Sequence, residues 1–402
     1  MSNKEKSPNK KTKKSTKKKE LNEKQIVRRK LLKIYPYLKR DKSFSALRKF
    51  LKSRIHKSGG VQLLNSKEVK QQRVWCWEVV KQVGKDFLEG KDLTRITLPV
   101  RLFEPRSFLE RLAEGFAYSP LYLEQAYKAT DPVERMKNVV CFMFAGLHLS
   151  ITNSKPFNPI LGETYQCYFQ NGTQVFCEQT SHHPPVSAFQ LIGPNDNYTY
   201  HGYGNWAASF RGNSVNVSQK GKYELDFSDG TKYIWDNPNV RINGILIKDR
   251  ITNYQGMIKF TDKKNDLGCV IFFDPDALGF FKSLIFSSST PKHCVKGYIY
   301  NLSKEKQKNW EDISLSNITG AWVDHLTFDE KVYWQIDTNL PERPHPSKTY
   351  IPSDSRYRKD RKALAKIEWD QAAKMKVEGE EKQRYDRKLR AQVIKDMKKN
   401  NN

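Results

Sequence analysis

The sequence predicts an α+β protein built on one large antiparallel sheet that curls into a nearly closed β-barrel. Over about residues 160–340, apolar and polar residues alternate in many short runs separated by turn residues, which is the pattern of half-buried strands. Helical spacing precedes this region at about 107–149, and a charge-rich helical pattern follows it at about 354–397. We expect a barrel because so many strands would otherwise leave exposed edges.

The net charge of +27 is concentrated at the two ends of the 402-residue chain. Residues 1–60 hold 22 Lys and Arg against 4 Asp and Glu, and residues 351–402 hold 16 against 9, which leaves the middle at +2. Hydrophobic residues make up 38% of the chain, as expected when polar ends dilute a globular middle. The sequence therefore predicts a basic tail over 1–60 and a folded domain over 61–402.

The basic tail itself has two parts. Residues 1–20 form a Lys, Ser and Asn tract that cannot bury apolar surface, so we expect disorder. Within 21–57, apolar residues such as Leu31 and Leu51 recur at helical spacing between Lys and Arg. Three roles stay open for this amphipathic segment: a helix packed on the domain, a contact with an anionic membrane surface, or a nuclear or nucleic-acid-binding tail.

The six cysteines show neither a CxxC pair nor metal-ligand spacing, so we expect reduced thiols, no metal and no cofactor. The N-terminus is rich in lysine without a following apolar core, and the longest apolar stretch, 139–149, is too short to cross a bilayer. A cytoplasmic location is the expectation.

A helix is also expected near the start of the folded domain, at about residues 70–90. Its pattern includes Trp75 and Trp77 among several valines. Two interpretations remain open: the tryptophans form the apolar underside of a movable lid, or they are core residues of a fixed helix.

The most distinctive stretch is Glu178–Pro185, with sequence EQTSHHPP. Its prolines fix φ, and Pro184 directs His183 towards an extended conformation. His182 and His183 then point in different directions, as neighbours on an extended chain do. Protonated imidazoles can donate hydrogen bonds to an anion.

Two further blocks place cations on rigid elements. In Lys155–Tyr165, Pro156 and Pro159 forbid a regular helix, so Lys155 and Asn158 are expected on a fixed loop.

On the C-terminal helix, Lys376, Glu380 and Arg384 lie at i, i+4 and i+8 and share one face. Glu380 can pair with both cations, which then present charge to a phosphate. Gly379 between them should weaken the helix by about 1 kcal/mol relative to Ala.

These blocks resemble those of the oxysterol-binding-protein-related family of lipid transfer proteins, and they occur along the chain in the same order as in that family. Residues 178–185 resemble the family fingerprint, and 155–163 resemble its KPxNPxLGE motif. Residues 96–100 with 104–109 resemble the segment where the lid meets the barrel, and 352–356 with 381–384 resemble its C-terminal region. The resemblance covers about residues 70–395. It implies a lipid cavity inside the barrel, closed by a lid formed by about residues 70–90.

The resemblance also implies a ligand and its site. The phosphorylated inositol of phosphatidylinositol 4-phosphate would be bound by His182, His183, Lys155, Lys376 and Arg384, with Asn158 and Glu380 orienting them. The candidates for contacts with the lid or with a second lipid are Thr97, Leu98, Trp75 and Trp77. Residues 93–99 and 104–109 look more like the phosphatidylserine-carrying branch than the sterol-carrying one.

The expected function is therefore exchange of two lipids between membranes, by a monomer that works at anionic membrane surfaces, including the endoplasmic reticulum and its contact sites. A sterol-binding or sterol-sensing protein of the same fold is the alternative. A nucleic-acid-binding protein is a further one, although the neutral middle and the lack of an aromatic-basic motif oppose it. An enzyme using His182 and His183 would need a third ligand or a nucleophile, for which the sequence offers no suitable spacing.

Overall fold

The computed structural model describes residues 55–56, 58–63, 66–84, 89–92, 98–151, 154–182, 184–273, 293–307, 309–336 and 338–400. The chain divides into two compact units, Met1–Leu51 and Lys52–Asn402, and every described residue belongs to the second. The predictions for the tail over 1–60 therefore lie almost entirely outside the described residues, and so do those for His183 and Thr97.

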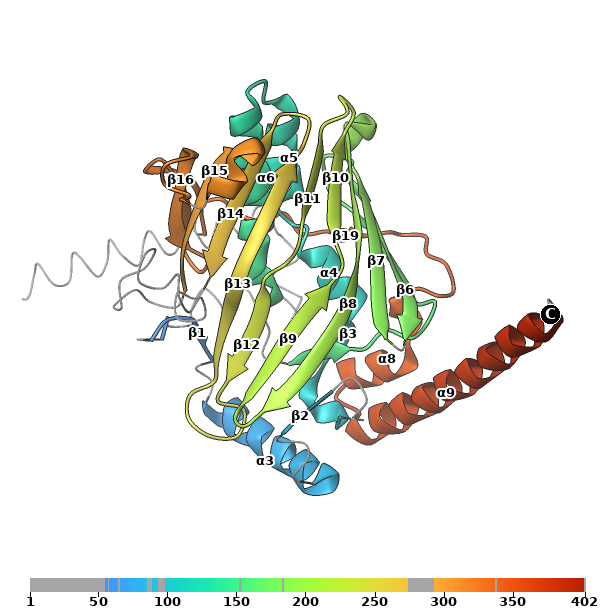
Figure 1. Ribbon diagram of the computed structural model, residues 1–402. Coiled ribbons are helices and arrows are strands. Elements are labelled where there is room, and N and C mark those ends of the chain that lie inside the picture. Colours follow the sequence, from blue (N-terminus) through green and yellow to red (C-terminus); the bar gives the residue numbers. More distant parts are fainter. Residues whose placement is uncertain are drawn as a thin grey trace, which may run out of the picture. The chain divides into compact units, whose positions relative to one another are not determined.

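One antiparallel sheet of 17 strands dominates the described part of the chain (Figure 1). Its strands are β1 (Val61–Gln62), β2 (Glu89–Asp92), β5 (Thr164–Tyr168), β6 (Gln174–His182), β7 (Pro185–Ile192), β8 (Tyr198–Arg211), β9 (Ser214–Lys220), β10 (Tyr223–Phe227), β11 (Lys232–Trp235), β12 (Asn239–Asn243), β13 (Ile251–Asp262), β14 (Leu267–Phe273), β15 (Cys294–Asn301), β16 (Ser314–Ala321), β17 (His325–Phe328), β18 (Lys331–Gln335) and β19 (His345–Pro346). The predicted α+β class with a large antiparallel sheet is confirmed.

The strand pairings follow the chain closely. From β19 the sheet runs through β5, β6 and β7 to the long strand β8. Two short paths, β10–β11 and β9–β12, then connect β8 to β13, and the sheet continues through β14, β15, β16 and β17 to β18. Asn171 and Gly172 form the hairpin turn between β5 and β6, where Gly172 has φ 91°.

Helices precede and follow the sheet, as the sequence predicts. They are α3 (Ser66–Val83), η5 (Val100–Leu102), α4 (Phe108–Glu114), α5 (Ser119–Lys128), α6 (Pro132–Gly146), η6 (Leu147–Ser150), η7 (Pro194–Asp196), η9 (Leu302–Gln307), η10 (Ser355–Tyr357), α8 (Lys359–Ala365) and α9 (Trp369–Asn400). Helix α6 begins at Pro132 and is capped by Asp131, whose carboxylate accepts a hydrogen bond from the backbone N–H of Glu134 at 2.9 Å. No helix within these ranges is both long and apolar enough to span a membrane.

Aromatic rings fill the space between the sheet and the helices before it. Tyr200 of β8 stacks on Trp235 of β11 at 5.1 Å, and Phe142 of α6 meets the edge of Tyr200 at 5.2 Å. Phe116, which follows α4, packs on Phe189 of β7 at 4.8 Å. These contacts anchor the helices to the sheet and so fix the start of α4, which borders the site described below.

Helix α3 differs in one respect from the prediction of an apolar underside containing both tryptophans. Val79 and Val80 form the buried face, against Phe210, Ile245 and Leu246, whereas Trp77 is 43% exposed and Trp75 is half-buried. The helix begins at Ser66, and its period places Val69, Cys76, Val79 and Val80 together. Trp77 therefore points away from the underside.

A small parallel pair, β3 (Phe103–Ser107) with β4 (Lys155–Phe157), supports the C-terminal helices. Phe103 and Phe157 stack at 5.1 Å, and Leu364 of α8 and Ala372 of α9 pack against them. Helix α9 continues through Gly379 without a break. This packing positions one face of α9 above the loop that follows β4.

Candidate functional site

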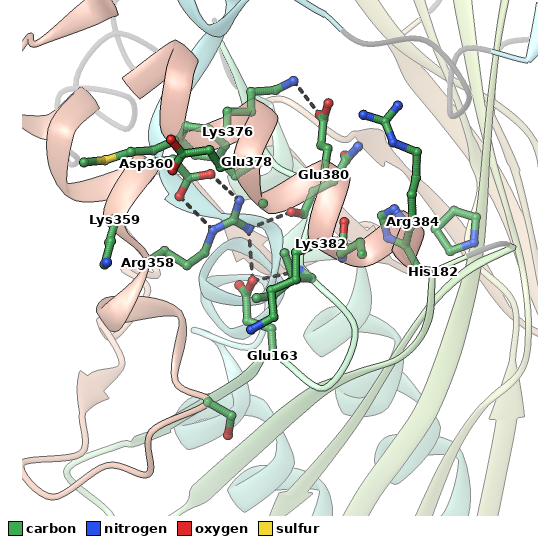
Figure 2. A pocket seen from close by; sticks show the side chains of 18 of the residues that line it. Glu163, His182, Arg358, Lys359, Asp360, Lys376, Glu378, Glu380, Lys382 and Arg384 are labelled. Carbon is green, nitrogen blue, oxygen red and sulfur yellow. Dashed lines mark hydrogen bonds and ion pairs between the residues drawn. The ribbon is translucent and has the colours of Figure 1, made fainter. Parts of the chain in front are cut away.

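A cavity of about 1150 Å³ lies between α9, the loop after β4, the end of the β6–β7 hairpin and β8 (Figure 2). Residues from all four segments line it. They include Asn158 and Glu163 of the loop, His182, Pro184 and Pro185 of the hairpin, Asn205 and Trp206 of β8, and Lys376, Glu380, Arg384 and Arg387 of α9. The chain thus brings together side chains that lie more than 200 residues apart in sequence.

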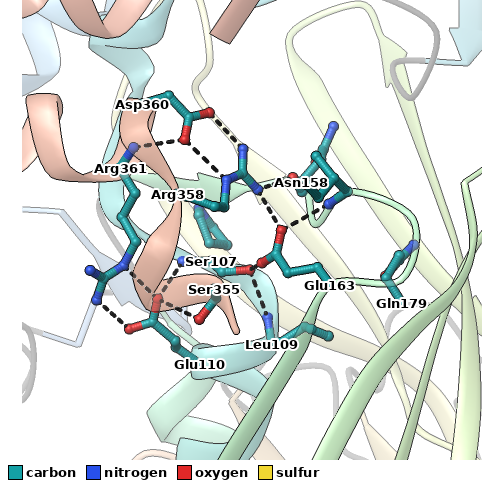
Figure 3. A network of polar contacts seen from close by, with 12 residues as sticks. Ser107, Leu109, Glu110, Asn158, Glu163, Gln179, Ser355, Arg358, Asp360 and Arg361 are labelled. Carbon is teal, nitrogen blue, oxygen red and sulfur yellow. Dashed lines mark hydrogen bonds and ion pairs between the residues drawn. The ribbon is translucent and has the colours of Figure 1, made fainter. Parts of the chain in front are cut away.

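The floor of the cavity is a buried ion-pair network centred on Arg358 (Figure 3). Its guanidinium donates to Asp360 at 2.6 and 3.0 Å, to Glu163 at 3.0 Å and to the backbone carbonyl of Asn158 at 2.6 Å. Burial disfavours the charge on Arg358, but Glu163 and Asp360 outweigh this effect and raise its pKa. Arg358 therefore holds the loop that carries Asn158.

A second layer ties the same loop to the start of α4. Ser107 caps α4 in a capping box with Glu110, and its hydroxyl donates to the buried carboxylate of Glu163. Arg361 of α8 donates twice to Glu110, at 2.7 Å each, and Ser355 donates to it at 3.3 Å. Three segments that are distant in sequence are therefore fixed to one another beneath the cavity.

Two lysines lie over the same aromatic ring beside the cavity. The ammonium of Lys155 is 4.9 Å from the centroid of Phe103, and that of Lys376 is 5.4 Å from it. Lys376 also pairs with Glu380 at 2.5 Å, and Lys155 donates to the side-chain oxygen of Asn158. Burial, helped by the charges of Lys376 and Arg358, lowers the pKa of Lys155 to about 7.

His182 is positioned by an irregular end of the β6–β7 ladder. The register shifts between Gln179 and Ser181, and the Gln179 amide donates to the Ser181 carbonyl at 2.6 Å. The Ser187 hydroxyl donates to Gln179 at 2.5 Å, and backbone hydrogen bonds of 2.9 Å join Gln179 to Gly162 and Glu163. This bulge places His182 at the cavity, beside Arg384 of α9 (Figure 2).

Four exposed cations stand at the rim of the cavity: Lys359, Lys382, Arg384 and Arg387. Within the described part of the chain, none of them forms an ion pair with an acidic side chain. The rim therefore presents positive charge that the protein itself does not neutralise, and an anion entering the cavity would meet it first.

Most of the candidate residues that the sequence singled out meet here. Asn158, His182, Lys376, Glu380 and Arg384 line the cavity, and Lys155, which is not in the lining, contacts two lining residues, Asn158 and Phe103. Leu98 is half-buried and packs under α3 and beside Val100, away from the cavity lining.

The sequence analysis missed Arg358, Arg387 and Glu163. For Arg358, a usable signal was the dense run of charges at 354–361, in which Asp354 and Asp360 are buried.

The fold and the cavity define a class of protein in which a large antiparallel sheet carries a cationic pocket bordered by a long C-terminal helix. The oxysterol-binding protein family model matches residues 77–349 and 332–400. The chain belongs to this family of lipid-binding and lipid-transfer domains. The resemblance seen in the sequence blocks is thereby confirmed.

Two relatives show how far the similarity extends in sequence. The chain is 40% identical over 351 residues to oxysterol-binding protein 9 of Dictyostelium discoideum, and the aligned region covers 84% of this chain and 81% of that protein. It is 35% identical over 249 residues to oxysterol-binding protein-related protein 1 of Mus musculus, covering 60% of this chain and 24% of that protein. The chain thus matches about a quarter of the mouse protein.

Solved structures share the fold. The Osh1 ORD domain in complex with ergosterol superposes with a TM-score of 0.65 at 25% identity, covering 92% of this chain and 88% of that one. The Osh3 ORD in complex with PI(4)P from Saccharomyces cerevisiae gives 0.62 at 22% identity, covering 79% and 84%. The second likeness is one of fold.

Proposed function

We propose that the cavity binds the phosphorylated headgroup of phosphatidylinositol 4-phosphate and that the chain exchanges this lipid for a second one between membranes. The observation that carries the proposal is the convergence of Lys155 and Lys376 on one aromatic ring, with His182 and Arg384 at the same cavity. Two ammonium groups that share a ring repel each other, and a phosphate between them would remove that repulsion.

The remaining lining residues suit a polyhydroxylated ring carrying a phosphate. The Asn158 amide and the Glu380 carboxylate can orient the two lysines. The carboxylate can also accept hydrogen bonds from hydroxyl groups, and the amide N–H groups can donate to them. We infer binding and transfer rather than catalysis because the lining combines cations, amides and aromatic rings on a fixed floor. His183 adjoins this lining in sequence and is proposed to take part, although it lies outside the described residues.

For the second lipid we propose phosphatidylserine, on the basis of residues 93–99 and 104–109. Thr97, Leu98 and Trp75 remain candidates for its contacts or for the lid, whereas the exposed Trp77 no longer suits an apolar underside. A sterol is the second candidate, because the Osh1 ORD domain, at 25% identity, was solved with ergosterol.

We also propose that the chain acts as a monomer, without a metal or cofactor, in the cytoplasm at anionic membrane surfaces, the endoplasmic reticulum and its contact sites included. Nucleic acid is not a proposed partner.

The direct test is lipid mass spectrometry on the protein purified from cells, together with extraction of phosphatidylinositol 4-phosphate from liposomes. We expect this phosphoinositide and phosphatidylserine among the bound lipids, and we expect H182A/H183A to lose extraction. A double variant that extracts the lipid as well as the unmodified chain would refute the role of the two histidines. A protein that carries only sterol would favour the second candidate.

A further inference from the structure

The C-terminal part of α9, residues 381–400, carries an exposed apolar stripe. The stripe consists of Tyr385, Leu389, Val393, Ile394 and Met397, which are between 49% and 62% exposed. At 100° per residue, these five positions fall within one half of the helix surface. An apolar stripe of this length on an otherwise charged helix calls for a partner.

This part of the helix gains no apolar support from the rest of the described structure. The apolar packing of α9 ends at Ala372, Ala373 and Met375, and beyond the cavity the helix projects away from the sheet (Figure 1). Among the described residues, the polar contact in this stretch is internal, from the Gln392 amide to the Asp396 carboxylate at 2.9 and 3.1 Å. Packing on the domain therefore does not explain the stripe.

The opposite half of the same helix is basic. Residues 381–400 contain eight Lys and Arg against three Asp and Glu. By the same 100° spacing, the half opposite the stripe contains Arg384, Arg387, Lys388, Lys395 and Lys399. The arc that holds the stripe also contains Lys382, Asp386, Arg390 and Asp396, so the apolar residues form a narrow stripe flanked by charges rather than an apolar half. A narrow apolar stripe with a basic half opposite it suits a helix that lies in the interface of an anionic membrane.

Other partners fit this arrangement less well. The stripe recurs every four residues and therefore drifts by 40° per step, so it does not form the straight seam that a second helix requires. Nucleic acid would neutralise the cations but leave the stripe in water. A bilayer surface accepts a tilted apolar stripe and supplies negative charge for the cations on both sides of it.

We propose that residues 381–400 bind the surface of an anionic lipid bilayer, with the apolar stripe at the boundary between headgroups and acyl chains. Arg384 and Arg387 belong both to this part of the helix and to the cavity lining. The contact thus holds the mouth of the cavity at the membrane surface. This link to lipid exchange rests on the proposed function, whereas the membrane contact itself does not.

The test uses the full chain, so that the basic N-terminal residues are the same in every arm. Hydrogen–deuterium exchange is followed for residues 381–400 with vesicles of phosphatidylcholine plus phosphatidylserine, and with phosphatidylcholine alone. We expect protection of this segment by the anionic vesicles only. L389Q/V393Q, which removes apolar surface without a change in charge, should lose the local protection and bind these vesicles about tenfold more weakly.

The matched control is M257Q/V332Q, which replaces two equally exposed apolar residues on strands and should behave as the unmodified chain. Unprotected 381–400 amides on anionic vesicles, or equal binding by L389Q/V393Q, would overturn the proposal. So would sedimentation showing that the stripe joins two copies of the chain, or protection by DNA and not by vesicles. Binding of soluble inositol 4-phosphate is measured in parallel. L389Q/V393Q should retain it, and its absence from the unmodified chain would count against the proposed function alone.

Discussion

The floor and the rim of the cavity use the same residue types in opposite ways. On the floor, Arg358 is enclosed by Glu163 and Asp360, so each of these buried groups has an oppositely charged partner beside it. At the rim, Arg384 and Arg387 are exposed and lack acidic partners among the described residues. Buried charge pairs stabilise the fold, because removal of one partner leaves the other charge buried without compensation. Exposed unmatched charges cost little to keep and are available to a ligand.

Lys155 and Lys376 stand between these two cases. Both are close to Phe103, but Lys376 has one acidic partner, Glu380, and Lys155 has only the neutral oxygens of Asn158 and Pro156 among its described hydrogen bonds. Changes in the floor should therefore alter the stability of the protein, and changes in the two lysines should alter its affinity for the ligand. Changes at the rim should alter the rate at which the ligand is attracted.

The largest effect is expected for Arg358→Ala. This change leaves the buried carboxylates of Glu163 and Asp360 without their cation, and such losses cost about 3–5 kcal/mol of the free energy of unfolding. Urea denaturation measures it. Arg384→Ala is the control, which should change stability by less than about 0.5 kcal/mol. Equal destabilisation by both variants would remove the distinction between floor and rim.

Lys376→Met should separate affinity from stability. The methionine keeps much of the apolar stem beside Phe103 but cannot donate to an anion. A hydrogen bond to a charged group contributes about 1.5–3 kcal/mol, so binding of soluble inositol 4-phosphate should weaken by about 10-fold to 100-fold. Calorimetric titration measures this, and the exposed Lys374→Met on the same helix is the control. Unchanged binding by Lys376→Met would exclude this lysine from the site.

Much of this arrangement could be predicted from the sequence because it depends on local periodicity. The alternation over 160–340 predicted the sheet, and the spacing of Lys376, Glu380 and Arg384 predicted their common helix face. Both patterns follow from backbone geometry alone.

The floor could not be predicted in the same way. Arg358 and Glu163 are 195 residues apart, and only the packing of α8 on the β3–β4 pair brings them together. The prediction that Trp77 belongs to the apolar underside of the helix was wrong for a related reason. The helix was expected from about residue 70, whereas it begins at Ser66, and its first turn supplies Val69, which belongs to the buried face.

The pH dependence of binding should reveal the state of Lys155. Its pKa of about 7 in the free protein means that it is largely charged below pH 7 and largely neutral above it. A bound phosphate favours the charged form and raises this pKa, so binding takes up a proton. Affinity should then fall as pH rises from 7 to 8, by at most about tenfold per pH unit. The phosphate has lost its second proton near pH 6 and stays dianionic over this range.

The control for this pH effect is Lys155→Arg, which keeps a permanent charge and should flatten the pH profile of inositol 4-phosphate binding. An identical slope in Lys155→Arg and the unmodified chain would assign the titration to another group, such as His182.

The smallest effect is expected at the rim. Arg384→Ala removes one exposed cation, so inositol 4-phosphate affinity at low salt should fall by about 1 kcal/mol or less, mainly through a slower association rate. The loss should shrink in 1 M salt, where the Debye length is about 3 Å. Stopped-flow association at several salt concentrations measures it, with Lys374→Ala as the control. A salt-independent loss through faster dissociation would instead mean that Arg384 closes onto the bound headgroup and acts like the two lysines over Phe103.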